Sequence, residues 1–198
     1  VIGFGAGEPD FASPDYVINE VKIAADDPKN HKYSPVAGLE SLRKEISRTT
    51  FKYSGVDINE NNVVVSNGGK QAIVTALMSI LDSGDEVIIP APYWVSYPDM
   101  VLLAEGTPKI VECPLDKNFI LQPEDLERAI TPKTKWIILN SPSNPTGSGY
   151  TWDDMKKITD VLIRHPNIWV MTDDMYEHLV YDAFKFCTPA EVEPELYS

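Results

Sequence analysis

The chain has 198 residues, of which 43% are hydrophobic and 24% are charged, and these proportions exclude disordered and collagen-like classes. Its 17 Lys and Arg residues against 30 Asp and Glu residues leave a formal net charge of −13, which argues against nucleic acid as a partner. No apolar run approaches the roughly 18 residues of a membrane span, and none opens the chain as a secretory leader would. Cys113 and Cys187 are expected to be free thiols in a reducing compartment, so we expect a cytoplasmic protein without a membrane partner.

The first part of the chain carries helical signals. Ser13 is the expected N-cap of a helix that continues to about Ala25. Apolar residues at helical spacing predict a second helix over 39–54, and Gly55 is expected to end it.

From residue 62 onward, short apolar strands alternate with helices. The strands are expected at 62–66, 87–89, 109–112, 136–139 and 168–171, and the helices at 71–81, 95–103, 123–130 and 152–164. Thr151 and Asp154 have the spacing of a capping box for the last helix. Continuous apolar strands separated by helices indicate a parallel sheet that is covered on both faces. We therefore predict an α/β fold with a three-layer α/β/α, mainly parallel sheet.

The first strand end carries a candidate phosphate site. Ligands of open parallel sheets bind beyond the carboxyl ends of the strands. Residues 66–71 (SNGGKQ) join the first predicted strand to a helix, and Gly68 and Gly69 would let backbone N–H groups approach a phosphate. An ordinary tight turn is the alternative. The segment is not a Walker A loop, since Gln71 stands where that motif needs Ser or Thr.

The later strand ends carry side chains that suit a flat ligand. Trp94 could stack on a planar ring, although such aromatic residues often belong to the core. Asn144 lies in a proline-rich turn whose amides could donate hydrogen bonds, and Tyr176 can reach the same space as Asp173. A carboxylate at the position of Asp173 needs a cationic partner. Together these groups fit pyridoxal 5′-phosphate, whose ring nitrogen a carboxylate keeps protonated.

Eight sequence blocks then resemble the fold-type-I pyridoxal-phosphate aminotransferases, and most nearly the bacterial class I aspartate aminotransferases. They are 6–11 (AGEPDF), 32–33 (KY), 37–38 (AG), 67–72 (NGGKQA), 84–87 (GDEV), 92–98 (PYWVSYP), 140–147 (NSPSNPTG) and 173–177 (D-x-x-Y-E). Each block is weak by itself, but the set follows the order of the family over nearly the whole chain.

The resemblance implies cofactor contacts for eight residues. Gly68, Gly69 and Lys70 would lie at the phosphate, Trp94 on the ring, Asn144 and Tyr176 at the ring hydroxyl, Asp173 at the ring nitrogen, and Tyr33 at the phosphate of the partner subunit. Asp174 is the neighbouring alternative to Asp173, and the D-x-x-Y spacing selects Asp173. Because Tyr33 would cross to the other subunit, the resemblance implies a homodimer.

The resemblance also implies substrate contacts for Gly7, Lys70, Trp94 and Asn144. In this subgroup a lysine at the position of Lys70 faces the acidic side chain of the substrate, which favours aspartate and glutamate as amino donors to 2-oxo acids. Related enzymes with the same lysine accept prephenate, so a prephenate or aromatic aminotransferase stays an alternative. Lys70 argues against a C–S lyase. A pyridoxal-phosphate-binding regulator domain without catalysis is a remote alternative.

The resemblance implies a Schiff-base lysine about thirty residues after Asp173, and therefore beyond Ser198. No catalytic residue is thus assigned within the chain. We expect the chain to be the N-terminal half of the enzyme, inactive alone, with residues 1–30 leading into a large cofactor-binding domain, 31–198. The three histidines lack metal-ligand spacing, so no metal is expected.

Overall fold

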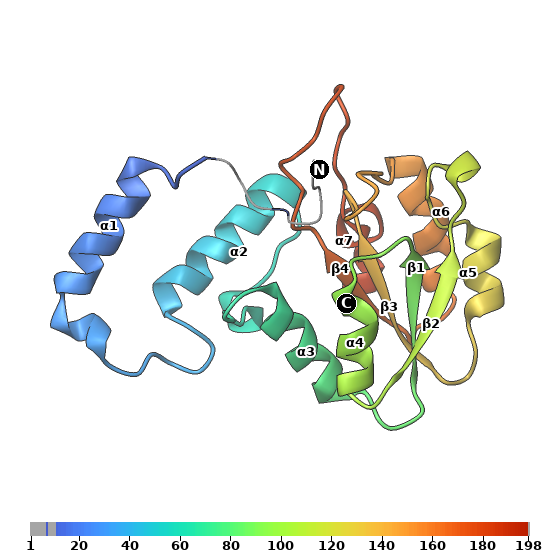
Figure 1. Cartoon of the computed structure of the whole chain (residues 1–198), viewed down its shortest axis with the longest axis horizontal. Helices are drawn as coiled ribbons and strands as arrows, with labels where there is room; N and C mark the ends of the chain where they lie inside the picture. The colour runs from blue at the N-terminus through green and yellow to red at the C-terminus, as the bar shows by residue number, and fades with distance from the viewer. Residues whose placement is uncertain (1–6, 8–10, 198) are drawn as a thin grey trace, which may run out of the picture.

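The computed structural model describes residue 7 and residues 11–197 (Figure 1). Its centre is a parallel sheet with the strand order β2-β1-β3-β4, formed by β1 (Glu86–Ala91), β2 (Thr107–Glu112), β3 (Thr134–Asn140) and β4 (Trp169–Asp173). The main helices around it are α3 (Gly69–Ile80), α4 (Ser96–Leu103), α5 (Pro123–Ala129) and α6 (Trp152–Leu162). The predicted three-layer α/β/α fold is therefore confirmed.

Two apolar cores lie on opposite faces of the sheet. Figure 1 shows α3 and α4 on one face and α5 and α6 on the other. Successive residues of a strand point to opposite faces, so Val87 and Ile89 of β1 enter the core with α3 and α4, whereas Ile88 enters the other. Burial on both faces explains why the strand sequences are continuous apolar runs.

Two helices precede this body and lie to one side of the sheet in Figure 1: α1 (Asp15–Asp26) and α2 (Glu40–Ser54). Gly55 ends α2 in the left-handed region with φ 70°, as predicted. The predicted N-cap Ser13 is wrong by one residue, since Pro14 holds the cap position of α1 and its carbonyl accepts the first helical bonds. The short elements are η1 (Pro28–His31), η2 (Glu60–Asn62), η3 (Leu115–Lys117), α7 (Pro189–Val192) and η4 (Pro194–Tyr197).

The strand predicted at 62–66 is wrong. Asn62 ends η2, and residues 63–66 do not form a ladder with any strand of the described chain, although Val63 has an extended backbone. Val65 instead donates its N–H to the Ala37 carbonyl oxygen at 3.0 Å. The β-branched residues favour an extended backbone, but a strand also needs a neighbouring strand, which local sequence does not reveal.

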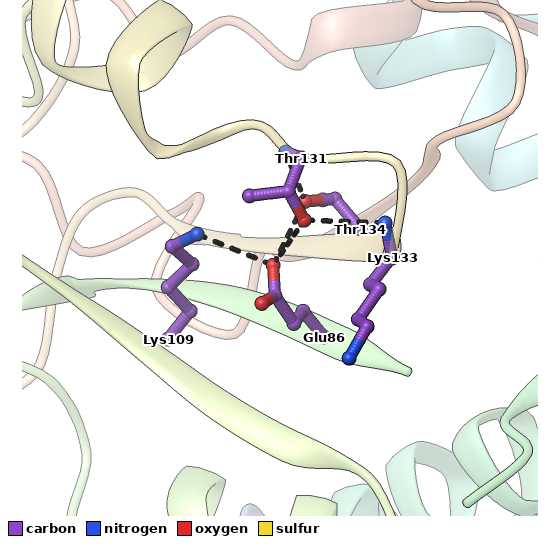
Figure 2. A network of polar contacts seen from close by, with 5 residues as sticks. All are labelled: Glu86, Lys109, Thr131, Lys133 and Thr134. Carbon is purple, nitrogen blue, oxygen red and sulfur yellow. Dashed lines mark hydrogen bonds and ion pairs between the residues drawn. The ribbon is translucent and has the colours of Figure 1, made fainter. Parts of the chain in front are cut away.

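A polar network ties the amino ends of the strands together (Figure 2). The Glu86 Oε2 atom accepts hydrogen bonds from Thr131 Oγ1 at 2.6 Å and from Lys109 Nζ at 3.2 Å. It also accepts a longer bond of 3.4 Å from Thr134 Oγ1. The hydrogen bond from Thr131 is the main cause that lowers the pKa of Glu86. The network thus joins β1, β2 and the loop before β3 at the edge opposite the strand ends that were expected to bind a ligand.

Candidate functional site

The predicted site residues gather where the strands end and α3 begins. Asp173 is the last residue of β4 and pairs in register with Asn140, the last residue of β3. Because parallel strands finish at one edge of the sheet, their last side chains are brought close together there. Trp94 lies in the turn between β1 and α4, and Lys70 lies in the first turn of α3.

A series of contacts connects α3 to the end of β4. The Lys70 Nζ atom lies 5.2 Å from the centroid of the Trp94 ring. Trp94 packs edge to face against Tyr97, with centroids 5.5 Å apart and an interplanar angle of 85°. The Tyr97 hydroxyl then donates a hydrogen bond of 2.6 Å to Asp173 Oδ2. The base of α3, the aromatic pair and the carboxylate therefore form one continuous group.

Asn140 links this group to the proline-rich turn. Its Nδ2 atom donates to the main-chain oxygen of Asp173 at 2.7 Å, and its Oδ1 atom accepts from the Asn144 N–H at 2.8 Å. The Asn144 Nδ2 atom donates in turn to the Tyr176 hydroxyl at 3.4 Å. The structure thus brings Asn144, Tyr176 and Asp173 together, as the sequence predicted.

Asn140 and Tyr97 were not among the predicted site residues. Both lie inside sequence blocks that carry the family resemblance, 140–147 and 92–98, so the blocks pointed to their segments. Nothing in those blocks shows which neighbours their side chains contact, because Tyr97 and Asp173 are 76 residues apart in the chain.

The start of α3 is open on its outer side. Gly68 has φ 85°, a conformation that side chains disfavour, and a Cβ built on Gly68 or Gly69 would meet nothing within 4 Å. No side chain in the described part of the chain caps the first turn of α3. Gln71 Oε1 accepts the preceding Asn67 N–H at 2.6 Å. The uncapped N–H groups of the first turn, the helix dipole and Lys70 suit a phosphate group.

Asp173 and Asp174 have different surroundings. Asp173 lies in the group with Tyr97, and its Oδ1 atom accepts the Met175 N–H at 3.3 Å. Asp174 accepts hydrogen bonds from the hydroxyls of Thr172 and, at 3.0 Å, Thr188, and lines a separate groove beside α2. Burial raises the pKa of Asp174 to about 6. Of the two carboxylates, only Asp173 is in contact with the aromatic pair.

Two of the predicted residues lie apart from this group. The Tyr33 side chain is fully exposed, at 106% of its reference accessibility, and Gly7 is exposed with nothing within 4 Å of a Cβ placed on it. Among residues 7 and 11–197, no cluster of three His, Cys, Asp or Glu side chains could hold a metal ion. No helix in those same ranges has the length and apolarity to span a bilayer.

Known proteins resemble both the sequence and the fold. The chain is 56% identical over its whole length to a probable aspartate/prephenate aminotransferase of Rhizobium leguminosarum bv. phaseoli, of which it covers 49%. It is 53% identical to an aspartate/prephenate aminotransferase of Cereibacter sphaeroides, and again covers 49% of that protein. The chain therefore spans about half the length of the curated relatives it matches.

Two solved structures that are similar to this chain are also those of aminotransferases. The aspartate aminotransferase of Rhizobium meliloti is 46% identical with a TM-score of 0.90, over 97% of this chain and 48% of that one. The aspartate aminotransferase of Thermus thermophilus with maleate is 39% identical with a TM-score of 0.91, over 96% of this chain and 49% of that one. The family model described as "Aminotransferase class I and II" matches residues 1–197. The chain thus belongs to the class I and II aminotransferases, the family that its sequence blocks resemble.

Proposed function

We propose that this chain is the N-terminal half of an aspartate aminotransferase, which moves an amino group between aspartate or glutamate and 2-oxo acids. Support comes chiefly from one arrangement, the continuous group formed by Lys70, Trp94, Tyr97 and Asp173 at the carboxyl edge of the sheet. Residues 31–198 would be the cofactor-binding large domain, and residues 1–30 would lead into it. The complete enzyme would act in the cytoplasm.

Pyridoxal 5′-phosphate is the cofactor of this family, and the donor set fits it. In the proposed arrangement Gly68, Gly69 and Lys70 bind the phosphate, Trp94 stacks on the ring, Asn144 and Tyr176 contact the ring hydroxyl, and Asp173 contacts the ring nitrogen. When bound, the cofactor supplies an electron-withdrawing ring that stabilises negative charge at the substrate Cα. The Asp173 carboxylate would maintain that property by holding a proton at the ring nitrogen.

The other residues of the group would orient the substrate and exclude water. Trp94 is half-buried, and its indole would cover a planar ring and keep solvent from it. Asn144, whose main-chain N–H is held by Asn140, would present its side chain to both ring and substrate. Lys70 and the Gly7 backbone would complete the substrate contacts, with Lys70 facing the acidic side chain.

Prephenate is the second candidate substrate. Two relatives that are 53–56% identical carry names with both aspartate and prephenate. A solved aromatic aminotransferase of Pyrococcus horikoshii is also similar, with 36% identity and a TM-score of 0.92 over 98% of this chain and 51% of that one. We favour aspartate and glutamate because Lys70 supplies a positive charge beside Trp94.

The decisive experiment is borohydride reduction of the complete protein in the presence of pyridoxal phosphate, followed by intact-mass and peptide-mass measurement. We expect one phosphopyridoxyl group on a single lysine beyond Ser198, and turnover of aspartate with 2-oxoglutarate. The 198-residue chain alone serves as the control and should show neither. Absence of a specific adduct on the complete protein would refute the proposal, and amino transfer from aspartate to prephenate but not to 2-oxoglutarate would favour the second candidate.

A homodimer belongs to the same proposal. Tyr33 is fully exposed, which leaves its phenol available to a partner subunit. In the proposed dimer the Tyr33 hydroxyl would donate a hydrogen bond to the cofactor phosphate of the other subunit. Two observations support this role of Tyr33, the exposed phenol and the family resemblance.

A further inference from the structure

We propose that Tyr97 is a positioning residue for Asp173, and this inference rests on the function proposed above. Its phenol O–H occupies one oxygen of the Asp173 carboxylate and leaves the other for the ring nitrogen of the cofactor. Tyr97 also supports the indole that would stack on the ring, so that one side chain sets the place of two groups that hold the cofactor.

The first support is the geometry of the hydrogen bond. The Tyr97 hydroxyl lies 2.6 Å from Asp173 Oδ2, within the range of strong hydrogen bonds to a charged acceptor. The Asp173 main-chain oxygen is held at the same time by Asn140 Nδ2 at 2.7 Å. Asp173 is therefore fixed through its main chain and through one carboxylate oxygen, while Oδ1 accepts only a longer bond of 3.3 Å, from the Met175 N–H, within the part of the chain that the structure describes.

The second support is the rigidity of Tyr97 itself. Its side chain is 2% exposed and belongs to the apolar core between the sheet and helices α3 and α4. Met100 and Val101 of α4 are buried in the same core, so the helix that carries Tyr97 is anchored next to it. A side chain packed in this way can hold its hydrogen-bond partner in one position.

The third support is the direction of the hydrogen bond, in which Tyr97 is the donor and Asp173 the acceptor. Burial, and next the hydrogen bond with Asp173, raise the pKa of Tyr97 far above its usual value. The phenol therefore stays protonated and donates a hydrogen bond to Asp173, which stabilises negative charge on the carboxylate. Tyr97 thereby holds the Asp173 carboxylate in the place from which its other oxygen would contact the ring nitrogen, and a carboxylate in that place favours the protonated ring.

The test compares two tyrosine variants of the complete protein, Tyr97→Phe and Tyr150→Phe. Tyr150 is the matched control because it is 4% exposed and its hydroxyl is also hydrogen-bonded, accepting the Leu121 N–H at 3.2 Å. The first readout is the dissociation constant of pyridoxamine 5′-phosphate, which binds without a covalent link. The second is the ¹⁵N chemical shift of the ring nitrogen in labelled, bound cofactor.

We expect Tyr97→Phe to raise the dissociation constant about tenfold, the size expected for losing one hydrogen bond to a charged group. The ¹⁵N shift should move toward the value of an unprotonated ring. Tyr150→Phe should lower the thermal midpoint and leave both readouts unchanged. In an Asp173→Asn background, Tyr97→Phe should add no further change to either readout, since Tyr97 acts through Asp173.

The outcomes separate this inference from the function on which it rests. Failure of the wild-type protein to bind the cofactor, or an Asp173→Asn variant without effect, would contradict the proposed function. If Asp173→Asn behaves as expected while Tyr97→Phe matches Tyr150→Phe, the role of Tyr97 is wrong. Should Tyr97→Phe fail to fold, 3-fluorotyrosine placed at position 97 retains a more acidic O–H, and an unchanged ¹⁵N shift would then overturn the role.

Discussion

Lys70 stands in the first turn of α3 with its Nζ atom 5.2 Å from the Trp94 ring centroid. Its charge is therefore held over the aromatic surface where the substrate is proposed to bind. We predict that Lys70→Met lowers kcat/KM for aspartate by about tenfold or more, because a charge-assisted hydrogen bond to the substrate is lost. The same variant should change kcat/KM for an aromatic amino acid much less.

The control for this prediction is Lys117→Met, which removes an exposed lysine from η3. Steady-state kinetics with both amino donors distinguish two roles of Lys70. An equal loss with aspartate and with the aromatic donor would assign Lys70 to the cofactor phosphate alone and contradict its role in substrate choice.

Asp174 gives a prediction about pH. Burial raises its pKa from 3.8 to about 6, so the folded protein binds more protons than the unfolded chain between these values. Stability contributed by this group is therefore present at low pH and is lost as the pH rises toward 6. Asp174→Asn stays neutral and can still accept from Thr188, so we expect it to be more stable than the wild type at pH 7 by about 2 kcal/mol.

Urea unfolding of the wild type and of Asp174→Asn at pH 4.5 and pH 7 measures this difference. The advantage of the variant should shrink at the lower pH. Asp116→Asn, at an exposed site in η3, is the control and should show no such trend. A variant that is less stable than the wild type at pH 7 would mean that the charged form of Asp174 is stabilised in the folded protein.

At the scale of elements, Glu86 joins three segments of the sheet through a single carboxylate oxygen. We predict that Glu86→Gln destabilises the fold by about 1 kcal/mol at neutral pH, since the bonds from Thr131 and Lys109 lose a charged acceptor. The pKa of Glu86 is lowered from 4.5, so its contribution is complete above that pH and is lost as the pH falls through its folded value.

Chemical denaturation as a function of pH tests this contribution. The difference between wild type and Glu86→Gln should vanish in acid, where Glu86 itself is protonated. Glu112→Gln, at an exposed position at the carboxyl end of β2, is the matched control and should behave as the wild type. A constant difference at every pH would show that size or packing, and not charge, makes Glu86 important.

At the scale of the whole molecule, α1 exposes apolar side chains and has no buried residue of its own. Tyr16 and Ile23 are seven positions apart, on one face of the helix, and are 73% and 63% exposed. We predict that this face is covered in the proposed homodimer. The double variant Tyr16→Asp, Ile23→Asp should therefore shift the complete protein from dimer toward monomer, because burying two carboxylates is costly.

Light scattering after size-exclusion chromatography measures this shift. Lys22→Asp adds an acidic residue on a different face of α1 and should leave the dimer intact. A double variant that remains fully dimeric would place the subunit interface elsewhere on the molecule.

The alternation of strands and helices could be predicted from the amino-acid sequence alone, and so could the segments that follow the strand ends. Periodicity, caps and apolar runs are local properties. Of the five strands that they predicted, four are present in the structure, as are the capping box at Thr151 and the end of α2 at Gly55. The same local signals predicted a strand at 62–66 that the structure lacks, since pairing depends on neighbours that are distant in the chain.

Which side chains meet at the strand ends depends on how distant segments of the chain pack together. The sequence selected Asp173 over Asp174 by spacing alone, and the fold shows Asp173 against Tyr97 and Asp174 against Thr172 and Thr188. The hydrogen bonds of Tyr97 and Asn140 were invisible in the sequence, because they join residues that only the closure of a parallel sheet brings together. Local preference sets the elements, whereas contacts between distant segments arrange the site.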